Sequence, residues 1–249
     1  MSGKLILIGC GPGAQDLMTL RAVNRISTAD VILYDRLVDD GWREFARTDA
    51  TIHYVGKAPG DGGKQQVSIN ELITDCLTNG KTVARLKSGD PMIFGRAVEE
   101  IASAVALDAE VEVVPGVTSA LAAASDAVIA VTERAELQSF VVTTGRTADD
   151  ESPDWAHSLK PGVCVAFYMG VAQAWKIQST LMAAGAPSDA PCDWIENAGR
   201  ENCRQVPTVL SRLARDTKLH QVENPAILLV RYPYSLANAD QNSVSASLA

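Results

Sequence analysis

A glycine-rich turn between two short apolar runs constrains the fold of this chain more than any other part of its sequence. Leu5–Ile8 is too short for a helix and leads directly into Gly9–Gly13, where every second residue is glycine. Such a run is typical of a buried strand, and the glycines let the backbone turn sharply or lie close to a ligand. A helical segment and a second apolar run, Val31–Tyr34, follow and end at Asp35. Strand, turn, helix, strand and acid predict a nucleotide-type binding unit.

Taken alone, this turn has two interpretations. Gly9, Gly11 and Ala14 fit the G-x-G-x-x-G/A fingerprint of dinucleotide sites, and Asp35 stands about where an acid would hold a ribose. Pro12 disagrees with that fingerprint, because proline lacks the N–H that such turns aim at a pyrophosphate. A nicotinamide or flavin site and a tight turn without a ligand both stay open on these residues.

Composition and charge narrow the classes of function. A chain of 249 residues can form one α/β domain or two of modest size. Its net charge of −8 argues against broad binding to nucleic acid or to an anionic membrane. No apolar run is long enough to span a bilayer, and the first strand follows the N-terminus directly, so we expect a cytoplasmic protein without a signal peptide. The five cysteines and three histidines are scattered, which predicts reduced, mostly buried thiols and no metal site.

Strand-like and helical segments alternate through the first half of the chain. The expected strands are 5–8, 31–34, 51–55, 82–86 and 111–114, and the expected helices are 16–27, 40–47, 68–80 and 95–107. This alternation predicts an α/β fold with a mainly parallel sheet and helices on its faces. Ser68 and Glu71 form a capping box, which predicts that the third helix begins at Ser68.

The second half is less regular, and Pro115-Gly116 predicts a hinge before it. We therefore expect an N-terminal α/β domain at 1–115 and a C-terminal α/β domain at 116–234. The expected strands there are 139–143, 163–168, 191–195, 204–207 and 226–230, and the expected helices are 118–125, 171–184 and 208–217. The polar, acidic segment 145–160 predicts a mobile loop, and the small, polar residues of 235–249 predict a disordered tail.

Polar and glycine-rich residues follow four strands of the first half. They are Gly9–Gly13, Asp35-Arg36, Gly56-Lys57 and Lys87–Pro91. Ligands of open α/β sheets collect at the carboxyl ends of the strands, so these stretches predict one binding rim. Each also has an ordinary alternative, since Asp35 could be a turn cap and Lys57 a solvated lysine.

Several of these stretches also carry a family resemblance. G-C-G-P-G, Y-D-R-L-V, V-G-K, R-L-K-S-G-D-P-M-I-F-G-R, V-V-P-G-V-T-S, F-Y-M-G and E-N-A occur in order between about Lys4 and Tyr232. In their residues and spacing they resemble the uroporphyrinogen-III C-methyltransferases, a group of the tetrapyrrole methylases. The resemblance implies two αβα domains, S-adenosylmethionine in the cleft between them, no metal, and a homodimer. It also makes Pro12 an expected part of the cofactor site.

The resemblance further implies roles for individual residues. Asp35 and Lys57 match the family's proposed proton acceptor and donor, although Lys57 could instead pair with a substrate carboxylate. The implied cofactor contacts are Pro12, Ser88, Gly89, Asp90, Ile93, Thr118, Ser119, Met169 and Ala198. The family substrate is a polycarboxylate, and the candidate residues to bind it are Arg36, Arg96 and Arg134, with Lys57 and Lys64. Ser88, Ser119, Glu133, Ala198 and the 57–67 loop depart from the commonest family pattern.

The reaction implied is transfer of two methyl groups from S-adenosylmethionine to C2 and C7 of uroporphyrinogen III. It gives precorrin-2 through precorrin-1, with S-adenosylhomocysteine as the second product. A methylase acting on a later precorrin is the main alternative, and a nicotinamide-dependent oxidoreductase or a non-enzymatic ligand sensor is a remote one. The chain ends before the dehydrogenase–ferrochelatase module of some relatives, so we expect the methyltransferase alone.

Overall fold

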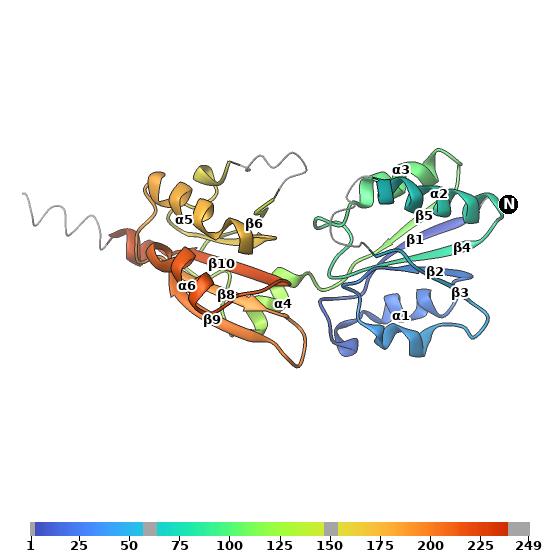
Figure 1. Cartoon of the computed structure of the whole chain (residues 1–249), viewed down its shortest axis with the longest axis horizontal. Helices are drawn as coiled ribbons and strands as arrows, with labels where there is room; N and C mark the ends of the chain where they lie inside the picture. The colour runs from blue at the N-terminus through green and yellow to red at the C-terminus, as the bar shows by residue number, and fades with distance from the viewer. Residues whose placement is uncertain (1–2, 57–63, 147–153, 239–249) are drawn as a thin grey trace, which may run out of the picture. The chain divides into compact units, whose positions relative to one another are not determined.

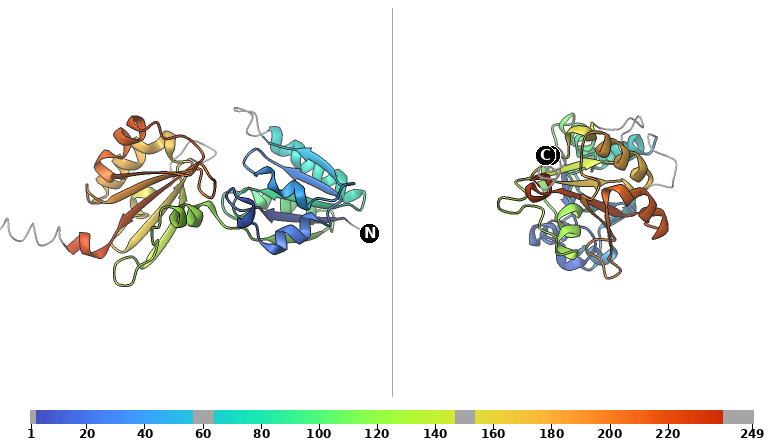
Figure 2. Two further views of the ribbon diagram at one scale, coloured as in Figure 1. Left: turned by 90° about the horizontal axis from the view of Figure 1, so that it is seen from below. Right: turned by 90° about the vertical axis from the view of Figure 1, so that its left-hand side faces the viewer.

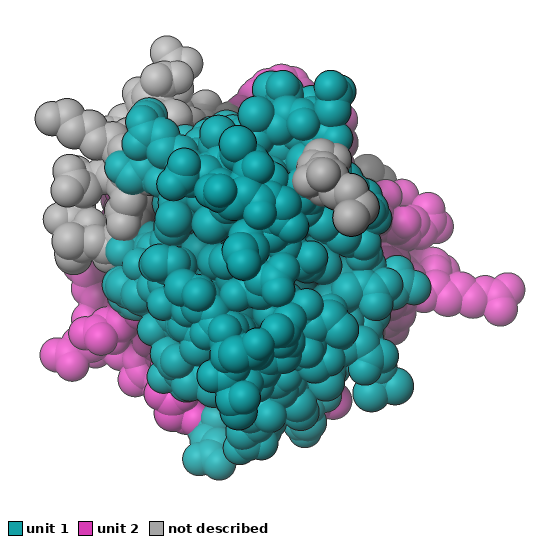
Figure 3. All heavy atoms as spheres, turned by 90° about the vertical axis from the view of Figure 1, so that its right-hand side faces the viewer, with its two compact units in different colours: residues 1–119, 199–201 teal, residues 120–198, 202–249 magenta. Residues whose placement is uncertain are grey.

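The computed structural model describes residues 3–56, 64–146 and 154–238 (Figure 1). The chain forms two compact units, which Figure 3 colours separately: residues 1–119 with 199–201, and residues 120–198 with 202–249. The domain limits expected from the sequence remain predictions. Within the described residues, no helix has the length and apolar character needed to cross a membrane.

The first unit is built on a five-stranded sheet. Its strands are β1 (Lys4–Gly9), β2 (Val31–Tyr34), β3 (Thr51–Tyr54), β4 (Thr82–Lys87) and β5 (Glu110–Val114). They lie in the order β3-β2-β4-β1-β5, and all four neighbouring pairs are parallel. The α/β class and the parallel sheet predicted from the alternation of segments are confirmed. The carboxyl ends of β1, β2 and β4 therefore lie at one edge of this sheet.

Helices cover both faces of this sheet (Figure 1). Alternate residues of β1 point to opposite faces, as in any strand. Ile6 and Ile8 pack in a buried cluster with α1 (Leu20–Ile26), whereas Leu5 and Leu7 pack with α2 (Lys64–Thr78) and α3 (Ala97–Val105). Burial of β1 on both sides explains why its sequence is a continuous apolar run instead of an alternating one.

The predicted start of the third helix at Ser68 is wrong, because α2 already begins at Lys64. The reason is a tertiary contact that the capping-box pattern does not contain. Gln66 is 7% exposed, and its side-chain amide donates to Asn70 Oδ1 at 3.1 Å and to Glu100 Oε1 at 3.4 Å. The predicted helix at 40–47 is a shorter 3-10 helix, Asp40–Phe45.

The second unit contains a mixed five-stranded sheet. Its strands are β6 (Ser139–Thr144), β7 (Val163–Tyr168), β8 (Pro191–Glu196), β9 (Arg204–Val209) and β10 (Ala226–Tyr232), and its helices are α4 (Ser119–Asp126), α5 (Ala174–Ala183) and α6 (Leu213–Leu219). The order is β6-β7-β10-β8-β9, with β6 and β7 parallel and the other pairs antiparallel (Figure 2). The predicted helix at 208–217 starts too early, because β9 continues to Val209 and a 3-10 turn precedes α6.

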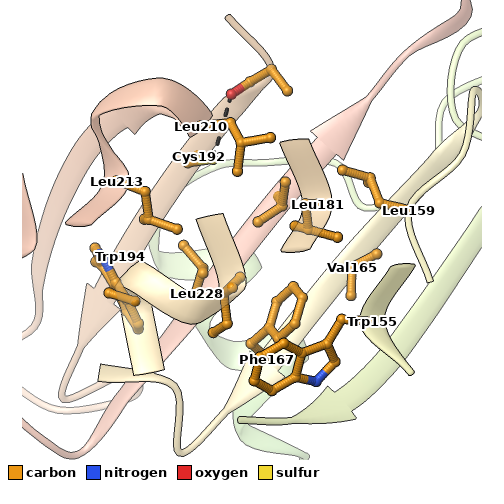
Figure 4. Packing of buried hydrophobic residues seen from close by; sticks show 14 of the residues in the cluster. Trp155, Leu159, Val165, Phe167, Leu181, Cys192, Trp194, Leu210, Leu213 and Leu228 are labelled. Carbon is orange, nitrogen blue, oxygen red and sulfur yellow. Dashed lines mark hydrogen bonds between the residues drawn. The ribbon is translucent and has the colours of Figure 1, made fainter. Parts of the chain in front are cut away.

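Large apolar side chains from sheet and helices fill the core of the second unit (Figure 4). Trp155 belongs to this core, although the sequence predicts a mobile loop there. It is fully buried, its ring lies 6.0 Å from that of Phe167, and its Nε1 donates to the carbonyl of Thr144 at 3.0 Å. The loop prediction is therefore wrong for residues 154–160, while 147–153 lie outside the described residues.

The predicted disordered tail is also wrong at its start. Residues 234–238 form a short helical turn in which Ala237 is 8% exposed. The backbone N–H of Ser235 donates to Glu136 Oε2 at 2.9 Å, which fixes this turn against the segment before β6. Residues 239–249 lie outside the described part of the chain.

We expect Trp155→Phe to lower the free energy of unfolding by about 1–3 kcal/mol, because it removes buried ring volume and the hydrogen bond to Thr144. Urea titrations measure this change. Trp175 is 72% exposed on α5, so Trp175→Phe should stay within about 0.5 kcal/mol of the wild type. Equal effects of the two substitutions would contradict a structural role for Trp155.

Candidate cofactor and substrate site

Two glycine turns pair with each other at the carboxyl edge of the first sheet. The N–H of Gly11 donates to the carbonyl of Gly89 at 3.2 Å, and the N–H of Gly89 donates to the carbonyl of Gly11 at 2.6 Å. Both residues have positive φ, 74° and 69°, which favours glycine. The turn after β1 and the turn after β4 thus form one continuous backbone surface.

Gly116 completes this surface from the end of β5. A Cβ on Gly9 would lie 2.5 Å from the backbone nitrogen of Gly116, and a Cβ on Gly116 would collide with the carbonyl oxygen of Gly89. Asp90 joins the turn after β4 to the segment after β5, because its Oδ2 accepts from the N–H of Gly116 at 3.1 Å. Its Oδ1 accepts from the N–H of Met92, within its own turn, at 2.8 Å. The Asp90 carboxylate therefore shapes the turn that carries it.

Seven of the predicted cofactor contacts belong to this part of the first unit. They are Pro12, Ser88, Gly89, Asp90, Ile93, Thr118 and Ser119. A Cβ on Gly89 would lie 3.3 Å from Ser119 Oγ, which places the two predicted residues side by side. The other two, Met169 and Ala198, belong to the second unit, where they follow β7 and β8. Both strands run antiparallel to β10, so Met169 and Ala198 follow them at the same edge of that sheet.

Asp35 lies where β2 ends, as predicted. Its Oδ1 accepts from the N–H of Leu37 at 3.2 Å, its Oδ2 lies 3.2 Å from Arg85 Nη2, and its side chain is 29% exposed. The carboxylate is thus oriented by two donors while it keeps access to solvent. Both the turn-cap role and a role in chemistry fit this geometry.

The predicted substrate-binding cations lie in different places. Arg36 is exposed next to Asp35, and Arg96 is exposed before α3, where it pairs with Glu99 at 2.7 Å. Arg134 is exposed in the second unit. Lys57 lies outside the described residues, and Lys64 opens α2, with its side chain outside the described part.

The sequence interpretation missed a buried charged group next to Asp35. Arg85 and Lys87 on β4 and Glu100 on α3 are 4%, 5% and 0% exposed. Burial and the charge of Arg85 lower the pKa of Lys87. The signal was present in the sequence, because R-L-K places charged residues at alternate positions of an apolar strand.

Arg200 was also missed, and no sequence pattern marks it. The segment Gly199–Glu201 belongs to the first unit. The carbonyl of Gly199 accepts from the N–H of Ala14 at 2.6 Å, and Arg200 Nη2 donates to the carbonyl of Leu37 at 2.8 Å. These contacts join the segment to the turn after β1 and to the loop after β2.

Cys10 stands inside the glycine turn but lacks the properties of a nucleophile. Burial, reinforced by the charge of Asp35, raises its pKa to about 12. At pH 8 its thiolate fraction is on the order of one in ten thousand. We expect Cys10 to resist Ellman's reagent in the native protein and to react once urea unfolds it. Rapid labelling of native Cys10 would contradict this.

A cavity of about 490 Å³ in the second unit has none of the predicted site residues in its lining. Lys160, Ala184 and Tyr232 contribute to its lining. They adjoin the start of β7, whereas Met169 follows its end. The described residues contain no group of three or more His, Cys, Asp or Glu side chains arranged to hold a metal ion.

Comparison with known proteins assigns the family. The model of the Tetrapyrrole (Corrin/Porphyrin) Methylases matches residues 4–214. The chain belongs to this family. It is a tetrapyrrole methylase, and the family resemblance inferred from the sequence is confirmed.

The relatives and solved structures agree with this assignment. The siroheme synthase of Hydrogenovibrio crunogenus is 39% identical over 229 residues, which cover 92% of this chain and 48% of that protein. Siroheme synthase 1 of Cronobacter sakazakii is 40% identical over 232 residues. The chain thus spans about half the length of these relatives. The uroporphyrin-III C-methyl transferase of Thermus thermophilus, complexed with S-adenyl homocysteine, superposes with a TM-score of 0.79 at 31% identity and 92% coverage of both chains. A cobalt precorrin-4 methyltransferase shares the fold, with a TM-score of 0.80 at 24% identity.

Proposed function

We propose that this methylase transfers two methyl groups from S-adenosylmethionine to C2 and C7 of uroporphyrinogen III, forming precorrin-2 through precorrin-1. The observation that carries the proposal is the likeness to the Thermus uroporphyrin-III C-methyl transferase over 92% of both chains. The motifs Y-D-R-L-V and R-L-K-S-G-D-P-M-I-F-G-R support it, because their residues end β2 and β4 and the Arg85–Asp35 ion pair brings these ends together.

The backbone surface around Gly9, Gly11, Gly89 and Gly116, called the glycine surface below, is the part of the first unit to which we assign the cofactor. Gly9, Gly89 and Gly116 let the turns after β1, β4 and β5 pack backbone against backbone, which fixes the shape of this edge of the sheet. Ser119 Oγ adds a polar group next to Gly89. We assign cofactor contacts to this surface and to Pro12, Ser88, Asp90, Ile93 and Thr118 of the first unit. Met169 and Ala198 of the second unit keep the cofactor contacts that the resemblance implies.

Asp35 is the residue to which we assign proton removal. The bound cofactor supplies a methyl group that its sulfonium already activates, so the protein mainly has to align donor and acceptor. As the C–S bond breaks and the new C–C bond forms, the macrocycle becomes cationic and must lose a proton. The Asp35 carboxylate can accept that proton, since two donors orient it and its side chain stays 29% exposed.

The substrate carboxylates require cations in a chain whose net charge is −8. We assign Arg36, Arg96 and Arg134 to these carboxylates, because guanidinium groups form bidentate pairs with them. Lys57 either donates a proton or pairs with a further carboxylate. Arg36, Arg96 and Arg134 are all exposed, and the Arg96 guanidinium pairs with Glu99 at 2.7 Å, so a substrate carboxylate would compete with Glu99 there.

Anaerobic incubation with uroporphyrinogen III and methyl-labelled S-adenosylmethionine tests this function. We expect two labelled methyl groups per macrocycle, and a precorrin-2 spectrum after the second transfer. No label on uroporphyrinogen III would overturn the proposal. Transfer to a later precorrin alone would favour the alternative substrate.

We also propose that the chain acts as a homodimer, as the resemblance implies. Light scattering after gel filtration gives the molar mass directly, to be compared with 26.5 kDa for one chain. A mass of one chain at the concentrations of the assay would contradict the dimer without affecting the proposed chemistry.

A further inference from the structure

One buried carboxylate in the first unit holds two buried cations. Glu100 on α3 is fully buried, and its Oε1 accepts a hydrogen bond from Arg85 Nε at 3.2 Å. Its Oε2 lies 2.8 Å from Lys87 Nζ. Arg85 and Lys87 are alternate residues of β4, so both project from the same face of the sheet, toward α3.

Each cation in turn reaches a residue at the carboxyl edge of the sheet. Arg85 Nη2 lies 3.2 Å from Asp35 Oδ2, and Lys87 Nζ donates to the carbonyl of Gly95 at 2.6 Å. Gly95 precedes Arg96, whose φ of 54° puts it in the left-handed region that few side chains favour. Glu100 is therefore linked through Arg85 to Asp35, the proposed base, and through Lys87 to the backbone just before Arg96.

Stability alone is a weak reason to keep these charges in the core. Buried ion pairs lose their hydration, and replacing them by apolar residues of similar volume is often neutral or stabilising. The surrounding layer between sheet and helices is mostly apolar, with Val83, Ala97 and Ala104 fully or almost fully buried, and one further polar side chain, Gln66, donates to Glu100 Oε1 at 3.4 Å. The chain of ion pairs from Glu100 through Arg85 reaches Asp35, whose side chain is 29% exposed. This connection to the surface indicates a role at the edge of the sheet.

We propose that Glu100 is a positioning residue for methyl transfer, which fixes the Asp35 carboxylate through Arg85 and the Gly95–Arg96 backbone through Lys87. This inference rests on the proposed function, because Asp35 and Arg96 have those roles only in that reaction. Glu100 is fully buried, so it acts through the two cations and not by touching the substrate.

Charge balance explains why a carboxylate is needed at this point. Arg85 and Lys87 repel each other, and burial together with this repulsion lowers the pKa of Lys87. Glu100 and Asp35 compensate both cations. Without the charge of Glu100, Arg85 and Lys87 would move apart, and the groups that they hold would move with them.

A double-mutant cycle in the full chain tests the inference. We expect Glu100→Gln to lower kcat for methylation of uroporphyrinogen III by about 10- to 100-fold, the cost of a displaced catalytic group, with the Kd for S-adenosylhomocysteine nearly unchanged. In an Asp35→Asn background, the same substitution should lower kcat by less than it does in the wild type, because its effect through Arg85 is already lost and only its effect through Lys87 remains. Glu100→Asp should recover part of the loss.

Glu112 provides a matched control. Its carboxylate also pairs with two cations of the first unit, Lys4 Nζ at 2.9 Å and Arg25 Nε at 2.7 Å. Within the described residues, neither of these cations pairs with Asp35. Glu112→Gln should therefore leave kcat near the wild-type value. If Glu100→Gln does not fold, Arg85→Lys replaces it in the cycle, since lysine keeps the charge but cannot contact Glu100 and Asp35 through separate nitrogens.

The outcomes separate the two proposals. A wild-type chain that does not methylate uroporphyrinogen III overturns both the proposed function and this inference. Two outcomes with an active wild type overturn the inference alone. In the first, the fold-losses in kcat caused by Glu100→Gln and Asp35→Asn multiply in the double variant. In the second, Glu100→Gln lowers the melting temperature but leaves kcat unchanged.

Discussion

Replacing Asp35 by asparagine is expected to lower kcat for methyl transfer by about 100- to 10,000-fold, the contribution of a positioned general base. Asparagine keeps the shape of the side chain and an oxygen that can accept from the N–H of Leu37, but it cannot take up a proton from the macrocycle. The Kd for S-adenosylmethionine should change by only a few-fold, because none of the proposed cofactor contacts is removed. Single-turnover assays with labelled cofactor and equilibrium binding measure the two quantities separately.

Asp39 is the control that distinguishes proton transfer from turn capping. Its Oδ1 accepts from the N–H of Gly41 at 3.1 Å, the same contact across two residues that Asp35 makes with Leu37 at 3.2 Å. If Asp35 only caps its turn, Asp35→Asn and Asp39→Asn should have similar small effects. A large loss of kcat confined to Asp35→Asn supports the base, whereas an unchanged kcat removes it from the mechanism.

The parts of the fold that the sequence predicted well depend on local patterns. β1 and β2 are short, mainly apolar runs, and such runs form strands where both faces are buried. The meeting of the residues after β1, β2 and β4 at one edge followed from the same reasoning, since residues after parallel strands lie at the same edge of the sheet. The family resemblance was inferred from the motifs. Pro12 was the residue that argued against a dinucleotide site and agreed with this family.

The errors share one physical cause, which is that distant contacts outweighed local patterns. Trp155 lies in a polar, acidic stretch, but burial of its ring against Phe167 orders the segment. Gln66 extends α2 because its side chain meets Glu100 across the unit. Arg85 and Lys87 were read as part of a motif, and their partner Glu100 could be found only when α3 was placed over β4. Local pattern thus predicted the strands, and packing decided the remaining details.

Gly116→Ala is expected to lower the free energy of unfolding by at least about 3 kcal/mol, which is the upper end of the cost of inserting a methyl group into a packed core. The added Cβ would collide with the carbonyl oxygen of Gly89 and lie 2.8 Å from the Cα of Gly9, and both neighbours are backbone atoms that cannot rotate away. The pairing of Gly11 with Gly89 would have to open, so binding of S-adenosylhomocysteine should weaken with stability. Urea titrations and isothermal titration calorimetry measure the two effects.

Gly185→Ala separates this collision from the general cost of replacing a glycine. Gly185 has a φ of 88°, and a Cβ there would meet nothing within 4 Å, so its substitution adds only backbone strain of about 1–2 kcal/mol. Gly185 follows α5 and belongs to the second unit. Gly185→Ala should therefore destabilise without a matching loss of cofactor affinity at temperatures where the protein stays folded. If both variants lose affinity in proportion to stability, the glycine surface has no specific part in holding the cofactor. If Gly116→Ala alone loses affinity while still folded, the close approach of three backbones is a requirement of the cofactor site.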